Sequence, residues 1–179
     1  MAMLIAAKNA HLESFKLTAL QQAADAAEVA AQQIAEYPPA LTPVTVAQFL
    51  LESNWGRSGM GDANNYFGIK ARAGEPFVMK DTTEFVNGKP VKVQQPFRRY
   101  ESMAECFADH ARLICNRTAN GKKIYAKALE NPNDPVAFAN ALTGVYATDP
   151  QYGSKLVSIM KDRGLLETFG FSLSEPAQS

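Results

Sequence analysis

One glutamate, Glu52, stands in a setting that suits acid catalysis. It ends a predicted helix whose preceding residues, 44–51, are mostly apolar, and the single tryptophan of the chain, Trp55, follows closely. We expect this carboxyl to be partly desolvated, and desolvation favours the protonated form of a carboxyl. A retained proton is what the leaving oxygen of a glycosidic bond requires. A plainer interpretation competes with this one, because most glutamates at helix ends are surface residues.

Further groups of aromatic and polar residues follow Glu52 at compatible spacing. They are Asn64-Asn65-Tyr66-Phe67-Gly68-Ile69-Lys70, Phe97-Arg98-Arg99-Tyr100, Phe107-Ala108-Asp109-His110-Ala111 and Tyr146-Ala147-Thr148-Asp149-Pro150. Together with the segment around Glu52, these motifs resemble family 73 of the glycoside hydrolases, the flagellar and autolysin-type peptidoglycan endo-β-N-acetylglucosaminidases. The resemblance runs from about Val44 to Leu165 and leaves residues 1–40 uncovered.

The resemblance implies an activity and three catalytic positions. It implies hydrolysis of the β-1,4 bond between N-acetylglucosamine and N-acetylmuramic acid in the peptidoglycan glycan strand. By motif, Glu52 matches the general acid of the family and Tyr146 the tyrosine of the catalytic centre. Glu84 matches the position proposed for a second carboxylate. The alternative for Tyr146 is a core aromatic with a satisfied hydroxyl.

The role of Glu84 stays open at the level of sequence. An inverting enzyme needs its two carboxyls about 6.5–9.5 Å apart, and a retaining enzyme needs about 5 Å. The N-acetyl group of the substrate can also replace a protein nucleophile. Otherwise Glu84 is a solvated strand residue.

Substrate contacts are expected beside the acid. Trp55 and Tyr66 offer surfaces on which a sugar can stack. Asn64 and Asn65 either contact sugar or cap backbone groups of their own loop. His110 shares an apolar helix face with Phe107 and Ile114, so we interpret it as a structural core histidine.

Helical segments must position these residues. Residues 15–36, rich in Ala, Gln and Glu, predict a helix that Pro38-Pro39 stops. Thr42-Pro43 predicts the start of the helix that leads to Glu52. Ser102 to Glu105 form a capping box, and Asp134-Pro135 and Asp149-Pro150 predict two later helices over about 135–143 and 150–163.

A β-hairpin interrupts the helices. β-prone residues flank Asn87-Gly88, a strong hairpin signal, although Lys89-Pro90 is expected to lengthen or distort the turn. The predicted fold class is α+β, mainly α, and the resemblance adds a lysozyme-like arrangement with a small β-hairpin lobe. The predicted division is an N-terminal helical extension (1–40), a catalytic domain (41–167) and a C-terminal tail (168–179).

Composition limits the partners. Hydrophobic residues make up 46% of the 179 residues, which argues against disorder, and the formal net charge is zero. We therefore expect no nucleic-acid partner and, with no apolar stretch near 18 residues, no membrane insertion.

Cys106 and Cys115 fall on opposite faces of one predicted helix and cannot pair. Nothing in the spacing calls for a metal or a cofactor. Residues 86–127 carry nine Lys and Arg against three Asp and Glu, which suits an anionic polymer or a merely solvated surface.

The biological role is the least determined. Residues 1–10 lack a basic start, so we expect a protein made in the cytoplasm without a signal peptide that acts on a cell wall. A bacteriolytic toxin or a phage endolysin fits this expectation, and a toxin implies a cognate immunity protein that blocks the groove. One alternative is a muramidase or lytic transglycosylase, although their usual Gly-Leu-Met-Gln type segment is absent. The other is a non-catalytic peptidoglycan-binding module on the same fold.

Overall fold

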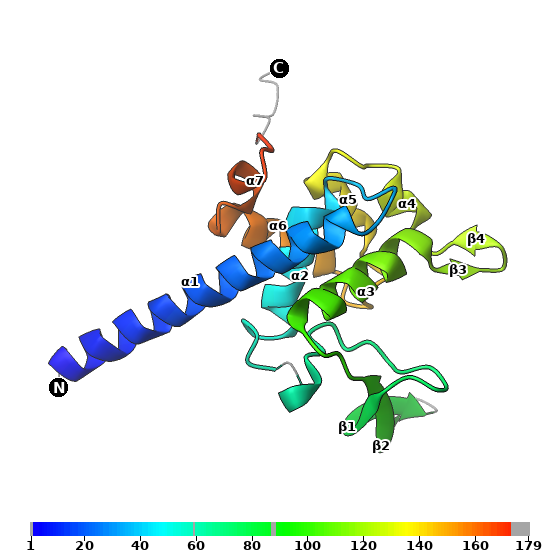
Figure 1. Ribbon diagram of the computed structural model, residues 1–179, viewed down its shortest axis with the longest axis horizontal. Helices are drawn as coiled ribbons and strands as arrows, with labels where there is room; N and C mark the ends of the chain where they lie inside the picture. The colour runs from blue at the N-terminus through cyan, green and yellow to red at the C-terminus, as the bar shows by residue number, and fades with distance from the viewer. Residues whose placement is uncertain (1, 59, 87–88, 173–179) are drawn as a thin grey trace.

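Helices form the body of the molecule, and one long hairpin lies at its edge (Figure 1). The computed structural model describes residues 2–58, 60–86 and 89–172, and it describes no side chains for residues 2–9 and 84–86. The helices are α1 (Ala2–Gln32), α2 (Leu41–Glu52), α3 (Met103–Asn116), α4 (Ala126–Leu129), α5 (Pro135–Ala141), α6 (Tyr152–Asp162) and α7 (Leu165–Thr168), with a 3-10 turn at Gly61–Ala63. The strands are β1 (Phe77–Val86), β2 (Lys89–Arg98), β3 (Thr118–Ala119) and β4 (Lys122–Lys123). The predicted mainly helical domain with a small β lobe is confirmed.

Helix α2 forms the centre of the core. Residues 41–50 are all buried, and α1, α3, α5 and α6 pack around them. A helix that is apolar on nearly every side belongs in a core. The helix begins at Leu41, before the predicted Thr42 cap, and Ala40 supplies no side-chain cap. Pro43 is tolerated because backbone N–H groups in the first turn have no partner within the helix.

Helix α1 is longer than the sequence pattern predicts and packs through alanines. It begins at Ala2 and ends at Gln32, and its N-terminal half extends beyond the helical body (Figure 1). Its buried face consists of Ala19, Ala23, Ala26, Ala27 and Ala30. Within the described residues, neither α1 nor any other helix is long and apolar enough to cross a membrane. The division at residue 40 stays a prediction, although these alanines belong to the common core cluster.

The predicted hairpin is confirmed as an antiparallel ladder. Pairing runs from Phe77 opposite Arg98 to Val86 opposite Lys89. Lys89 and Pro90 therefore belong to β2, and the expectation that they lengthen the turn is wrong. A two-stranded hairpin has open edges, where a proline that lacks an N–H is tolerated. The Asn87-Gly88 turn itself lies outside the described residues.

The later helices begin close to their predicted caps. Ser102 Oγ accepts a hydrogen bond from the Glu105 N–H at 3.2 Å, and Asp134 Oδ1 accepts from Val136 and Ala137 at 3.0 and 2.9 Å. Helix α6 begins at Tyr152, two residues after the predicted start. Asp149 Oδ1 instead accepts from the Gln151 N–H at 2.9 Å, so it stabilises the turn that precedes the helix.

Close packing of α6 on α5 depends on Gly153. A Cβ at this position would lie 2.6 Å from Asn140 Cα and 2.9 Å from the Ala139 carbonyl oxygen. We expect Gly153→Ala to lower the free energy of unfolding by about 1–3 kcal/mol, because overpacking against backbone forces the helices apart. Urea unfolding measures the change, with Ser158→Ala at an exposed position of α6 as the control. A variant as stable as the parent would contradict close packing of α6 on α5 at Gly153.

Candidate active site

Glu52 is the last residue of α2 and is exposed. The expectation of a partly desolvated carboxyl is therefore wrong for the protein alone, because the buried run of α2 ends at Leu50. Beyond it, Asn54, Trp55 and Gly56 have φ values of +48°, +63° and +79°, a left-handed turn that L-residues rarely adopt. The Ser53 hydroxyl accepts from the Gly56 N–H at 2.8 Å and stabilises this turn. The turn leads the chain away and leaves the carboxyl open on one side.

A buried tyrosine from α6 holds the carboxyl of Glu52. Tyr152 donates a hydrogen bond to Glu52 Oε1 at 2.8 Å and accepts one from Gln48 Nε2 at 3.0 Å. Gln48 lies one helical turn before Glu52, so both α2 side chains meet the same hydroxyl. The amide nitrogen of Gln48 only donates, which directs the single proton of Tyr152 to Glu52. Sequence analysis missed Tyr152 and Gln48; the spacing of four residues between Gln48 and Glu52 was the available signal.

Tyr146 stacks on Tyr152, next to the acid. Their ring centroids are 5.6 Å apart with planes inclined by 18°. Burial and then the negative charge of Glu52 raise the pKa of Tyr146 well above its usual value. Burial first, and then Tyr146 and Glu52, also raise the pKa of Tyr152. Both phenols therefore stay protonated and can donate hydrogen bonds at physiological pH.

His110 lies beneath Tyr146 in the core. It is fully buried, its ring stacks on Phe67 with centroids 4.0 Å apart, and it meets Tyr146 edge-on at 5.8 Å. Among the described residues, neither ring nitrogen has a hydrogen-bond partner. Burial lowers the pKa of His110 to about 3, so the ring is neutral. The interpretation as a core histidine agrees with this position.

Asn64 and Asn65 bond to backbone groups of their own region. The buried Asn65 amide donates to the carbonyls of Ile69 and Arg98, each at 2.8 Å, and accepts from the Ile69 N–H at 3.0 Å. Asn64 Nδ2 donates to the Tyr100 carbonyl at 3.1 Å, and Asn64 Oδ1 accepts from the Tyr66 hydroxyl at 3.3 Å. Of the two roles considered for these asparagines, the geometry favours backbone capping. Tyr66 also contacts Phe49 edge-on at 5.3 Å and is only partly exposed.

The ring of Trp55 is in contact with two cations. Lys16 Nζ lies 5.6 Å and Arg163 Cζ 4.8 Å from the ring centroid. These cation–π contacts join α1 and the end of α6 to the turn after Glu52. A sugar that stacks on Trp55 has to share or replace them.

Glu84 lies in β1, opposite Val91 and two residues before the strand ends. Its side chain is outside the described part of the chain, so no separation from Glu52 follows. Its position on the hairpin places the proposed second carboxylate on a different lobe from the acid.

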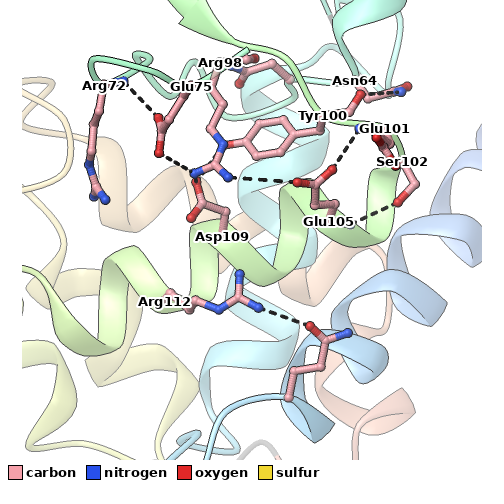
Figure 2. Close-up of polar contacts among 12 residues, drawn as sticks. Asn64, Arg72, Glu75, Arg98, Tyr100, Glu101, Ser102, Glu105, Asp109 and Arg112 are labelled. Atoms are coloured by element: carbon pink, nitrogen blue, oxygen red, sulfur yellow. Dashed lines mark hydrogen bonds and ion pairs between the residues drawn. The ribbon is translucent and has the colours of Figure 1, made fainter. Parts of the chain in front are cut away.

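A charged network fixes the base of that lobe (Figure 2). Arg98 Nη1 lies 2.9 Å from Glu75 Oε1 and 3.2 Å from Asp109 Oδ2. Tyr100 donates to the same Asp109 oxygen at 2.8 Å, and the Arg98 guanidinium lies over the Tyr100 ring at 5.1 Å. The network joins β2, the loop before β1 and α3.

The site contains acid and hydrogen-bonding groups suited to glycosidic chemistry. It places one open carboxyl, Glu52, beside two protonated phenols, and a pocket of about 410 Å³ adjoins Tyr146. Within the described residues, no group of three or more His, Cys, Asp or Glu side chains is arranged to hold a metal ion. A larger pocket of about 650 Å³, between the end of α1 and the end of α3, includes none of the predicted site residues.

Comparison with known sequences identifies a family. A family model described as glucosaminidase, mannosyl-glycoprotein endo-beta-N-acetylglucosaminidase, matches residues 22–165. The exo-glucosaminidase LytG of Bacillus subtilis is 37% identical over 138 residues, which are 76% of this chain and 49% of that protein. A probable N-acetylmuramidase of Lactococcus lactis is 38% identical over 139 residues, 76% of this chain and 32% of that protein. The chain thus spans half or less of the length of these relatives.

Comparison with solved structures gives the same fold. The catalytic domain of the autolysin Auto from Listeria monocytogenes superposes with a TM-score of 0.75 and 29% identity, covering 86% of each chain. The lysozyme-like arrangement expected from the sequence is therefore confirmed.

Burial of His110 predicts a specific pH dependence. Below pH about 6.5 the unfolded chain protonates this histidine while the folded protein does not, so stability is lost as the pH falls from about 6.5 towards 3. We expect His110→Phe to remove roughly 1–2 kcal/mol of the stability difference between pH 7 and pH 5. Urea unfolding at both pH values measures it, with the exposed His11→Gln as the control. An unchanged pH dependence in His110→Phe would count against a neutral, buried ring.

Proposed function

The chain belongs to the glucosaminidase family, family 73 of the glycoside hydrolases, and we propose that it hydrolyses the β-1,4 bond between N-acetylglucosamine and N-acetylmuramic acid in peptidoglycan. The observation that carries the proposal is the carboxyl of Glu52, held at one oxygen and open at the other. Peptidoglycan as the substrate is inferred from the family. The complete activity of the relatives is not carried over, because they are longer proteins than this chain.

Glu52 acts as the general acid in this proposal. Its Oε1 accepts the hydrogen bond of Tyr152, so the transferable proton resides on Oε2. No protein donor or acceptor engages Oε2 within the described residues, which leaves this oxygen for the leaving oxygen of the glycosidic bond. A bound glycan strand supplies the desolvation that the exposed carboxyl lacks. Tyr152 is a positioning residue, since it acts through Glu52.

Tyr146 and Glu84 complete the proposed chemistry. Tyr146 is a neutral donor next to Glu52, which suits binding of an N-acetyl carbonyl or of the attacking water. Glu84 serves as the second carboxylate if the hairpin brings it within about 10 Å of Glu52. If it stays farther away, the N-acetyl group of the substrate provides the nucleophile.

Two of the four predicted substrate-binding residues are proposed to contact the glycan directly, and two are proposed to support the site. Tyr66 and Trp55 keep partly exposed rings, and we propose that they border the glycan. Asn64 and Asn65 are proposed to act indirectly, because their amides bond to the backbone that supports Tyr66 and the loop after it.

Two alternatives remain specific enough to test. A muramidase would cleave the other glycosidic bond of the strand, and one relative carries that name. A non-catalytic binding module would bind peptidoglycan at the same site without cleaving it.

For the biological role, a bacteriolytic toxin or a phage endolysin remains a hypothesis. If the protein is a toxin, a cognate immunity protein is expected to cover Glu52 and Tyr146. The names of the reported relatives do not describe a toxin.

The bond that is cut identifies the activity. Mass spectrometry of fragments released from purified peptidoglycan should show reducing N-acetylglucosamine ends. Glu52→Gln should lower their release at least about 100-fold, because it removes the proton donor. The matched control is Glu28→Gln, an exposed glutamate of α1, which should act like the parent.

Other products would decide between the alternatives. Reducing or anhydro N-acetylmuramic acid ends would contradict the proposed bond and establish a muramidase or transglycosylase. No release by the parent protein would support a binding module.

A further inference from the structure

Two neighbouring pockets form one hollow beside Tyr146. The first, of about 410 Å³, is lined by Tyr146 and Tyr125 as well as by the loop after Phe67. The second, of about 280 Å³, reaches the Arg98 network. Both are lined by the same five residues: Ile69, Lys70, Arg72, Leu113 and Arg117. The hollow therefore extends from the proposed catalytic centre to the base of the hairpin lobe.

The lining of this hollow is strongly basic. Its cationic side chains are Lys70, Arg72, Arg98, Arg112 and Arg117, and its acidic ones are Glu75 and Asp109. Arg98 lies within 3.2 Å of both carboxylates, so these acids are already engaged at the base of the lobe. The excess positive charge considered below is therefore that of Arg72, Arg112 and Arg117.

The arginines in the shared wall are available to a ligand. Arg72 and Arg117 are exposed, and neither guanidinium forms an ion pair with any described carboxylate. Only the backbone N–H of Arg72 bonds to Glu75, at 2.8 Å, and its guanidinium is directed away from that carboxylate (Figure 2). Arg112, in the second pocket, donates to the neutral side chain of Gln33 at 3.3 Å and keeps its charge uncompensated. Guanidinium groups match the planar, bidentate geometry of a carboxylate.

We propose that Arg72 and Arg117 form a binding site for a carboxylate of the peptide that branches from the glycan. The inference rests on the proposed function, because it assumes a peptidoglycan substrate. In intact peptidoglycan the lactyl carboxyl of the muramic acid is tied up in the amide bond to the peptide, and the sugars are neutral. The free carboxylates lie on the peptide. A sugar bound at Tyr146 places its branch in the hollow, where the arginines select a peptide-bearing strand.

The test compares fragments that differ only in carboxylate charge. The substrates are soluble peptidoglycan fragments and the same fragments after conversion of their free carboxyls to amides. The enzymes are the parent protein and two double variants. The first carries Arg72→Gln and Arg117→Gln. The control carries Lys127→Gln and Lys161→Gln, which remove the same charge at exposed positions outside the hollow. Thermal unfolding confirms that each variant is folded.

A specific pattern is expected. The arginine double variant should show a KM about tenfold higher for the unmodified fragments, an unchanged kcat, and parent-like values for the amidated ones. The lysine double variant should behave as the parent on both substrates. The difference between parent and arginine variant should shrink as salt is raised, because exposed charges are screened.

Two results would overturn the inference without touching the proposed activity. One is an equal effect of the arginine substitutions on charged and amidated fragments, or no effect on either. The other is a raised KM of the arginine double variant on glycan strands that are stripped of peptide and whose lactyl carboxyls are converted to amides, since these strands contain no carboxylate for the arginines to bind. Failure of the parent to cleave any of the substrates would instead refute the proposed function.

Discussion

The hydroxyl of Tyr152 is the point on which the proposed site depends. It joins Gln48 and Glu52, one turn apart on α2, to the first residue of α6. The amide nitrogen of Gln48 can only donate to this hydroxyl, so the single hydroxyl proton of Tyr152 is donated to Glu52. An exposed carboxyl at a helix end would otherwise adopt several rotamers. The bond restricts it and reserves one oxygen for the proton that catalysis transfers.

The rest of the fold keeps α2 and α6 in the register that this bond requires. Gly153, next to Tyr152, lets α6 approach the backbone of α5. The rings of Phe67, His110, Tyr146 and Tyr152 contact one another in series, from the loop before the hairpin to the acid. The Arg98 network fixes the hairpin lobe at the other side. Rigid support of a reactive side chain by packed neighbours is what preorganised catalysis requires.

Local signals in the sequence predicted local structure well. The caps at Ser102 and Asp134, the hairpin around residues 87–88 and the helix that ends at Glu52 were all recoverable, because each depends on neighbours in the chain. The hydrogen bond between Glu52 and Tyr152 joins residues 100 positions apart in the chain. No local pattern in the sequence indicates such a long-range contact. The roles of Asn64 and Asn65 stayed undecided for the same reason, since their acceptors include carbonyls of Arg98 and Tyr100. The exposure of Glu52 depends on where the left-handed turn directs the chain, which composition does not reveal.

The central claim is that Tyr152 acts on catalysis through Glu52. A double-mutant cycle with Tyr152→Phe and Glu52→Gln, measured as kcat on peptidoglycan fragments with thermal unfolding followed in parallel, tests it most directly. The account predicts that Tyr152→Phe lowers kcat about tenfold or more in the parent and has little further effect once Glu52 is replaced. Equal losses in both backgrounds would contradict it, because Tyr152 would then act independently of the acid.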